Sequence, residues 1–182
     1  MGAAQHERTG TGATCDIAAW VAGASLQTMP AEVVERARAG VVDTVGVILA
    51  GVGEPVTRIA AGLVAGDGGA PVAAQLGTSL RTTAEAAALL NGISGHALDY
   101  DDVSASVTGH PSVVVLPAAM AAAELAGAPG SALLEAYVAG VEVMAKLGLA
   151  IGPAHYRAGW HATSTLGTLG AAAAAGRVLG LD

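Results

Sequence analysis

The sequence contains no phenylalanine, and aromatic residues make up only 3% of its 182 residues. A core without large rings has to be filled by smaller side chains, and 53% of the residues are hydrophobic. Alanine and glycine together occupy 69 positions, 43 and 26 respectively. Small side chains let helix backbones approach one another, so we expect closely packed helices. A chain this apolar is not disordered, and a chain this long needs neither disulfides nor metals to hold a core.

Positive charge is also scarce, with a single lysine, Lys146, and a formal net charge of −7. This excludes nucleic-acid binding, which needs basic patches to neutralise phosphates, and no polybasic run is present to bind an acidic membrane. The lone Cys15 cannot form an internal disulfide, which suits a reducing compartment, and we predict a cytoplasmic location. Residues 1–14 lack the apolar stretch of a signal peptide and are interpreted as a flexible lead.

Long uninterrupted apolar runs are missing too, although the mean hydropathy is +0.56. The two longest runs are interrupted, by Asp43 in residues 41–52 and by Pro117 and Glu124 in residues 113–128. A membrane-spanning helix needs about 20 mostly apolar residues. The sequence therefore predicts a soluble protein with buried helices, in which residues 15–182 form a single helical domain.

Helical periodicity dominates the chain after the lead. Apolar residues recur at steps of three and four along one face of residues 31–51: Val34, Ala37, Val41, Val45 and Ile48. A helix that opens within residues 28–32, with Pro30 in its first turn, is expected to end at Gly51. Further helices are expected over residues 16–24, 55–65, 83–95, 111–126, 130–151 and 163–179. Residues 70–82 predict a short irregular or extended piece, and residues 98–109 a polar, acidic loop. The fold class is an all-α bundle of about seven or eight helices.

The polar chemistry concentrates between His96 and His110, in a chain of which only 13% of the residues are charged. Three aspartates lie in this segment: Asp99, Asp101 and Asp102. His110 precedes the proline that opens a helix, where free N–H groups and the helix dipole favour an anion. His161 stands at the start of another apolar helix. Two histidines at two helix starts suit the binding and protonation of a carboxylate.

Structural roles compete with this interpretation. The aspartates are equally consistent with a solvated loop that caps helices, and a histidine before proline can cap the helix that follows. His96 is interpreted as a partly buried core histidine, and His6 and His155 as surface residues. Aspartate and histidine can also bind Mg²⁺ or Zn²⁺. No His-x-x-x-His, Glu-x-x-His or paired-cysteine spacing is present, however, so we predict no metal site.

The motifs of several other enzyme classes are absent. The sequence has no Gly-x-x-x-x-Gly-Lys-Ser/Thr phosphate loop, no Gly-x-Ser-x-Gly nucleophile elbow, and no strand–Gly-x-Gly-x-x-Gly–helix unit. Nucleotide-binding and serine-hydrolase chemistry therefore have no support in the sequence.

Two segments resemble the signature of a known family. The first is Asn91-Gly-Ile-Ser-Gly-His-Ala-Leu-Asp-Tyr-Asp-Asp102, followed by Gly109-His-Pro-Ser112 and Leu116-Pro-Ala118. The second runs from Gly159-Trp-His-Ala-Thr-Ser-Thr165 through Leu166-Gly-Thr-Leu-Gly-Ala-Ala-Ala173. Together they are similar to the MmgE/PrpD family, which includes 2-methylcitrate dehydratases, cis-aconitate decarboxylases and iminodisuccinate epimerases. The resemblance runs from about Asp16 to the last residue.

The resemblance implies a cofactor-independent lyase or isomerase that acts on a small di- or tricarboxylate by acid–base catalysis. It implies a helical domain, a smaller α/β lid and a homodimer. By the same resemblance, Asp99, His110 and His161 are the catalytic residues. We assign substrate binding to three further polar residues of these segments: Asp102, Ser112 and Thr163.

The chain departs from the family pattern in two respects. Val103 stands where a threonine often follows the Asp-Asp pair, which puts that contact in doubt. Family members are also longer, and their lid and active-site lysines lie beyond the part that this chain resembles. The alternative hypothesis is therefore a shortened, non-catalytic relative that serves as a binding or assembly module, or one half of a split enzyme.

Two structural expectations follow. Because Asp99, His110 and His161 each lie close to a helix end, a bundle can bring them to one pocket, within about 10 Å of one another. An incomplete helical domain leaves an apolar face uncovered, and such faces mark interaction sites. We therefore expect a homo-oligomer or a complementing chain.

Overall fold

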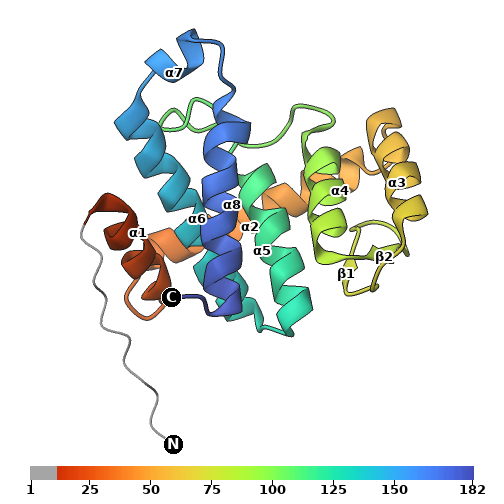
Figure 1. Ribbon diagram of the computed structural model, residues 1–182, viewed down its shortest axis with the longest axis horizontal. Coiled ribbons are helices and arrows are strands. Elements are labelled where there is room, and N and C mark those ends of the chain that lie inside the picture. Colours follow the sequence, from red (N-terminus) through yellow and green to blue (C-terminus); the bar gives the residue numbers. More distant parts are fainter. Residues whose placement is uncertain (1–11) are drawn as a thin grey trace, which may run out of the picture.

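The computed structural model describes residues 12–182, which form eight helices and one two-stranded hairpin (Figure 1). The helices are α1 (Ala13–Ala22), α2 (Ala31–Gly51), α3 (Pro55–Asp67), α4 (Ala84–His96), α5 (Ser112–Ala126), α6 (Gly130–Ile151), α7 (Ala154–Arg157) and α8 (Ala162–Leu179). The strands are β1 (Ala73–Ala74) and β2 (Arg81–Thr82). The all-α prediction is confirmed, and the extended piece expected at residues 70–82 is this hairpin.

Helices α6, α8, α5 and α4 lie side by side as one layer, and α2 crosses behind them (Figure 1). Helix α1 packs against one end of this arrangement, on α6 and α8, and α3 packs against α4 at the other end. The chain bends by 85° between α2 and α3. Each helix of the layer therefore packs against the next one, and the loop between α4 and α5 lies at the edge of the layer.

Helix α2 shows how the apolar stripe determines packing. Its predicted face is the one turned inward: Ala37 and Ile48 are buried, and Val41 and Val45 pack against the core of α5 and α6. The charged residues of the opposite face are exposed and form the ion pairs of the helix surface, such as Arg36 with Glu32. The periodicity of the sequence thus predicted the end of this helix at Gly51 and its buried face, and the helix begins directly after Pro30.

Helix α5 is the most deeply buried of the helices. Val115, Leu116 and Pro117 are fully buried in it, and the helix packs on α2, α4, α6 and α8. Pro117 lies inside the helix, in its second turn, and its missing N–H removes one helical hydrogen bond there. A helix that is apolar on nearly all sides is typical of the centre of a domain.

Glycines allow α6 and α8 to approach at the crossing point. A Cβ added at Gly140 would lie 2.6 Å from the carbonyl oxygen of Gly170, and a Cβ added at Gly170 would lie 2.8 Å from that of Gly140. Real Cβ atoms do not approach so closely, so larger residues at either position would separate the two helices. The close packing expected from the alanine and glycine content therefore has a definite location.

The hairpin is attached to α4 by a buried amide. The Oδ1 of Asn91 accepts a hydrogen bond from the backbone N–H of Leu76 at 2.9 Å, and its Nδ2 donates to the carbonyl of Ala74 at 2.9 Å. Asn91 begins the first family-like segment, and in this structure it holds the hairpin in place. Helix α4 itself begins at a Thr83 cap, whose hydroxyl accepts from the N–H of Ala86.

Several apolar side chains remain exposed on the outer helices. Ile59 is 68% and Leu63 71% exposed on α3, and Val42 is 72% exposed on α2. Within residues 12–182, no single helix is long and apolar enough to cross a membrane, although the bent pair α2 and α3 meets the length and composition together. The exposed residues of α3 lie on one end of the helix layer.

The first helix begins earlier than predicted, and one short helix was not predicted. Helix α1 begins at Ala13, after Gly12, so Asp16 lies in its first turn and does not cap it. The predicted lead, residues 1–14, therefore overlaps the start of α1, and residues 1–11 lie outside the described part. The four-residue helix α7 was not predicted, because Pro153 and a short polar segment give no helical period.

Candidate active site

The candidate site lies in the loop from Ala97 to Pro111, which joins α4 to α5. The loop is folded back on itself by a bridge between Ser104 and Gly109. Thr108 has a positive φ of 57°, which turns the chain between the two partners of the bridge. This turn directs the first half of the loop and His110 toward one another.

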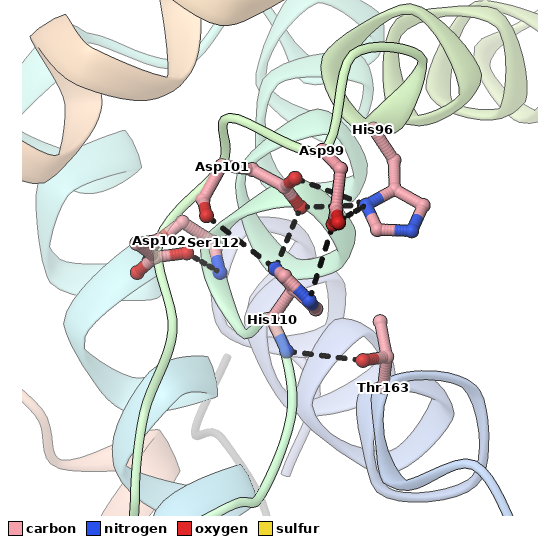
Figure 2. A network of polar contacts seen from close by, with 7 residues as sticks. All are labelled: His96, Asp99, Asp101, Asp102, His110, Ser112 and Thr163. Carbon is pink, nitrogen blue, oxygen red and sulfur yellow. Dashed lines mark hydrogen bonds and ion pairs between the residues drawn. The ribbon is translucent and has the colours of Figure 1, made fainter.

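Four side chains of this region form a compact group, which we call the His–Asp cluster (Figure 2). Its members are His96, Asp99, Asp101 and His110. His96 comes from the end of α4, and the two aspartates and His110 come from the loop, in which His110 lies two residues before α5. The two imidazole rings meet edge to face, with centroids 4.9 Å apart.

Asp101 lies at the centre of the cluster, with a side chain that is only 1% exposed. Both of its carboxylate oxygens lie 3.0 Å from Nδ1 of His96. Its Oδ2 lies 3.3 Å, and its backbone carbonyl oxygen 3.4 Å, from Nδ1 of His110. A buried carboxylate requires partners that donate hydrogen bonds or carry positive charge, and here both partners are imidazoles.

Asp99 occupies the opposite, solvent-facing side of the cluster. Its side chain is 77% exposed, and its Oδ1 lies 3.7 Å from Nε2 of His110 and 4.0 Å from Nδ1 of His96. Its backbone has a positive φ of 55°, an unfavourable conformation for a residue with a Cβ, although aspartate tolerates it better than most. Strained backbone of this kind is concentrated at functional sites.

A second network lies beside the cluster and joins the loop to α5 and α6. Asp102 accepts two hydrogen bonds from Ser112, from its N–H at 3.1 Å and from its hydroxyl at 2.6 Å. The Ser112 oxygen also lies 2.6 Å from the hydroxyl of Tyr137 on α6. Since the Ser112 proton goes to the carboxylate, the Tyr137 hydroxyl donates to Ser112. We call these three residues the Asp–Ser–Tyr network.

This network occupies the anion-binding position that the sequence suggested at the start of α5. The carboxylate at the helix N-terminus is Asp102 of the chain itself, so Ser112 is paired internally and is fully buried. The structure thus places two of the predicted substrate-binding residues in contact with each other rather than side by side on an open surface.

The network also affects Tyr137. Burial raises the pKa of Tyr137 above its ordinary value, and the negative charges of Asp102 and Asp43 act in the same direction. The hydrogen bond with Ser112 acts in the opposite direction, because it stabilises the ionised form. The phenol is therefore held in its neutral, hydrogen-bond-donating form.

The start of α8 closes the site from the other side. The buried hydroxyl of Thr163 accepts a hydrogen bond from the backbone N–H of His110 at 3.0 Å (Figure 2). A Cβ added at Gly109 would lie 2.7 Å from that hydroxyl oxygen and 3.0 Å from the Thr163 nitrogen. The absence of a side chain at Gly109 therefore allows α8 to contact the loop, and Thr163 positions His110 through its backbone.

His161 precedes α8, two residues before Thr163. His161 is exposed to solvent. Its carbonyl oxygen accepts hydrogen bonds from Ser164 and Thr165 in the first turn of the helix. Within residues 12–182, its imidazole takes part in none of the polar contacts of the His–Asp cluster. The structure thus brings Asp99 and His110 together, whereas His161 stands at the beginning of the helix that contacts them.

Sequence reasoning missed two members of the cluster. Asp101 was interpreted only as one of three loop carboxylates, and His96 as a core histidine, but the His96 side chain is 43% exposed and contacts Asp101. The position of His96, directly after a predicted helix and five residues before Asp101, was the available signal. His155 is not a simple surface residue either: it stacks on Trp160 and contacts the Thr165 hydroxyl at 2.7 Å.

An open groove with a volume of about 420 Å³ adjoins the cluster between α4, α5 and α8. His96 and Thr163 contribute its polar edge, and the rest of its lining is apolar, including Leu89, Ile93 and Val114. A groove with an apolar wall and a few polar groups at one side is the usual form of a small-molecule site.

The cluster also satisfies the minimal geometry of a metal site. Each of its four side chains offers one ligand atom, and these atoms all lie within 4.8 Å of one another. Imidazole nitrogens and carboxylate oxygens are common zinc ligands. The same four groups form an acid–base cluster when the positive charge is carried by protons on the imidazoles.

Lysine and arginine side chains of the described part contact other regions. Arg177 binds the carbonyl of Ala24 and the carboxylate of Glu135, and Lys146 pairs with Glu142 on the α6 surface. Two carboxylates of the cluster are therefore balanced by imidazoles and not by permanent cations.

The fold and the site together define a helical domain that presents a histidine–aspartate acid–base cluster at the junction of two helices. Residues 15–182 match the family model of the MmgE/PrpD N-terminal domain, and the chain belongs to the MmgE/PrpD family, whose chemistry is of the dehydratase and decarboxylase type. This confirms the resemblance that the two segments suggested.

Curated relatives agree with this assignment. A cis-aconitate decarboxylase-like protein of Aspergillus oryzae is 31% identical over 177 residues, which cover 93% of this chain and 37% of that protein. Cis-aconitate decarboxylase of Aspergillus terreus is 29% identical over 179 residues, covering 94% and 36%. The human cis-aconitate decarboxylase is 42% identical over 101 residues, covering 53% and 21%. The chain thus spans little more than a third of the length of the relatives it matches throughout.

Proposed function

We propose that this chain supplies the acid–base residues of a lyase that acts on a small di- or tricarboxylate, by decarboxylation or dehydration and without a cofactor. Epimerisation in the same substrate class needs the same proton transfers and belongs to the same proposal. Asp99, His110 and His161 are the proposed catalytic residues, and Thr163 positions His110.

One observation carries the proposal. Nε2 of His110 and Oδ1 of Asp99 lie 3.7 Å apart, and the Asp99 side chain is 77% exposed. This separation is too long for a strong direct hydrogen bond, and the gap opens toward solvent. A reacting group that enters there meets an imidazole on one side and a carboxylate on the other, which is the pairing that general acid–base catalysis requires.

The chemistry follows from that pairing. When the bond between a carbon atom and a carboxylate breaks and CO₂ leaves, the electron pair remains on the carbon chain and has to be captured by a proton. Elimination of water instead needs a base to remove a proton from carbon and an acid to protonate the departing hydroxyl. Decarboxylation thus needs a group that donates a proton to carbon, and dehydration needs one group that accepts a proton and one that donates a proton. The names of the relatives make cis-aconitate the first substrate to test.

A tricarboxylate also needs positive charge, and the described lysines and arginines lie elsewhere in the fold. We propose that a second copy of the chain, or a complementing chain, provides this charge and covers the exposed apolar residues of α3. Desolvated carboxylates are costly unless they are paired, which is the physical reason for expecting such a partner. The cytoplasmic location predicted from the single cysteine is part of the same proposal.

The test is a mass-spectrometric turnover screen with purified protein. Cis-aconitate, citrate-like and succinate-like acids are incubated with the chain alone and with the product of any adjacent reading frame. We expect loss of CO₂ or water from at least one tricarboxylate. The matched control is His155→Gln, which replaces a histidine outside the cluster and should leave the turnover unchanged.

A second candidate is a binding or assembly module without catalysis. The absence of lysine and arginine contacts at the cluster, among residues 12–182, favours it. This candidate predicts that tricarboxylates bind, by calorimetry, without being converted under any of the screened conditions. Conversion by the chain, alone or with its partner, would exclude it.

A further inference from the structure

We propose that Asp101 is a positioning residue that fixes both imidazoles of the cluster, His96 and His110, in the tautomer that carries the proton on Nδ1. Each Nε2 is then left unprotonated and available as a base. The role of these bases in catalysis rests on the proposed function, whereas the tautomers themselves do not.

The contacts of His96 give the first half of the argument. Its Nδ1 lies 3.0 Å from both carboxylate oxygens of Asp101, within hydrogen-bond distance of each. An ionised carboxylate accepts hydrogen bonds and cannot donate them. Nδ1 therefore has to be the donor, and the neutral ring keeps its lone pair on Nε2.

The contacts of His110 give the second half. The two oxygens nearest to its Nδ1 both belong to Asp101, the carboxylate Oδ2 at 3.3 Å and the backbone carbonyl at 3.4 Å. Neither of them can donate a hydrogen bond, so this Nδ1 also carries a proton. Thr163 holds the backbone of His110, and the imidazole side chain is only 16% exposed, so the surrounding residues restrict its rotation.

The burial of Asp101 makes this arrangement specific. The Asp101 side chain is 1% exposed, so water does not replace the imidazoles as its hydrogen-bond donors. The neighbouring Asp99 is 77% exposed and can be hydrated, so it imposes no such requirement. One buried carboxylate thus determines the state of two rings that come from two different helices.

The consequence is a pair of bases that differ in access. Nε2 of His110 faces Asp99 across 3.7 Å, inside the cluster. His96 is 43% exposed and lines the groove between α4, α5 and α8. With the proposed function, His96 becomes a second proton carrier that can exchange protons with solvent, while His110 faces the substrate.

The direct experiment is nuclear magnetic resonance of ¹⁵N-histidine-labelled, chelator-treated protein, with long-range correlation of ring protons to ring nitrogens. Protonated and unprotonated ring nitrogens have well-separated ¹⁵N shifts, so the spectrum identifies the tautomer of each neutral ring. His96→Gln and His110→Gln each remove one set of signals and so assign the spectrum. We expect Nδ1–H for both rings; a dominant Nε2–H form in either ring would overturn the proposal.

Variants of Asp101 test the cause. In Asp101→Asn the amide NH₂ faces one of the two Nδ1 atoms, so at least one ring should change to the Nε2–H form. Asp101→Glu, which keeps the carboxylate, should retain at least part of the Nδ1–H population. The control Asp67→Asn removes an exposed carboxylate at the end of α3, away from both rings, and should leave both tautomers unchanged. Unchanged tautomers in a folded Asp101→Asn protein would overturn the proposal.

The outcome is separable from that of the proposed function. If the tautomers are as expected and no carboxylate is converted, the assignment of Asp101 stands and the proposed function fails. If turnover is found but the rings carry their protons on Nε2, the reverse holds. The wild-type spectrum decides the tautomers even if a variant fails to fold.

Discussion

The two adjacent carboxylates Asp101 and Asp102 lie on different sides of one loop and have different roles. Asp101 faces the imidazoles of the His–Asp cluster, beside the exposed and strained Asp99. Asp102 faces Ser112 at the start of α5 and completes the Asp–Ser–Tyr network, in which each polar group has a partner within the protein. The proposed chemistry therefore belongs to the His–Asp cluster, where Asp99 is exposed to solvent and lies 3.7 Å from His110.

The Asp–Ser–Tyr network holds in place the loop that carries the His–Asp cluster. The network anchors the start of α5 and connects it to α6 through Tyr137, so His110 emerges from a fixed helix end. Within residues 12–182, no buried side-chain nitrogen or oxygen lacks a hydrogen-bond partner. The comparison predicts that variants in the His–Asp cluster lose activity and that variants in the Asp–Ser–Tyr network lose stability.

The largest expected effect is on turnover. His110→Gln, Asp99→Asn and His161→Gln should each reduce carboxylate conversion by roughly 10²-fold or more, the usual contribution of an acid–base group. The free energy of unfolding should change by less than about 1 kcal/mol, because these side chains are at least partly accessible. Steady-state assays and urea denaturation measure the two quantities. If the variants lose folding rather than activity, the residues are helix caps and the comparison fails.

The second effect is on stability. Asp102→Ala removes the acceptor of two hydrogen bonds at the start of α5 and leaves the buried Ser112 without it. We expect a loss of about 1–3 kcal/mol in the free energy of unfolding. The control Asp67→Ala, at the exposed end of α3, should change it by less than about 0.5 kcal/mol. Equal stabilities of the two variants would show that the network does not support the loop.

The third effect depends on pH. Because the pKa of Tyr137 is raised in the folded state, the unfolded chain ionises this phenol first, near its ordinary pKa of about 10. The stability contributed by the neutral phenol is fully present below that pH and is lost as the pH rises through the folded-state pKa. The free energy of unfolding should therefore fall above about pH 10, and less steeply in Tyr137→Phe.

Tyr137→Phe should also reduce the stability of the protein at neutral pH. Loss of the hydroxyl that donates to Ser112 should lower the free energy of unfolding by about 1 kcal/mol. The control Tyr100→Phe changes an exposed residue of the loop and should alter neither the neutral stability nor its alkaline decline. A wild-type protein whose stability is unchanged across this range would contradict the role assigned to Tyr137.

The smallest expected effect is that of a chelator. In the acid–base interpretation, protons on Nδ1 already satisfy the Asp101 carboxylate, and removal of divalent metal should leave turnover unchanged. Incubation with EDTA, followed by the assay and by elemental analysis of the protein, checks this. Activity that is lost with EDTA and restored by zinc would make the cluster a metal centre.

The fold was predictable where local signals agree. The predicted helix combines a proline at its start with a regular apolar stripe that ends at Gly51, and α2 ends there and begins directly after Pro30. The start of α1 was predicted too late, since Gly12 offers no capping side chain and the helix is stabilised by packing of its apolar side, including Val21, on α6. Helix α7 has no period to detect and is held by contacts of His155 that come from later in the chain.

The site was predictable only in part, for a related reason. Sequence motifs indicated Asp99 and His110, and the structure places them 3.7 Å apart. The three aspartates of the loop have the same local pattern, so nothing in the sequence distinguished buried Asp101 from exposed Asp99 or from the capping Asp102. The distinction depends on the end of α4 and the start of α5 approaching each other, which is a property of the tertiary structure.

The left-handed backbone of Asp99, with φ at 55°, sets stability and activity against each other. Glycine adopts this conformation without steric cost, so Asp99→Gly would relieve strain on the order of 1 kcal/mol while it removes the carboxylate. Selection of random variants for heat resistance alone would therefore enrich glycine at this position. Such a protein would be more stable to heat but, with the proposed role of Asp99, inactive. Selection that also requires turnover would have to find its stabilising substitutions elsewhere, for example in the open helical positions around Gly46.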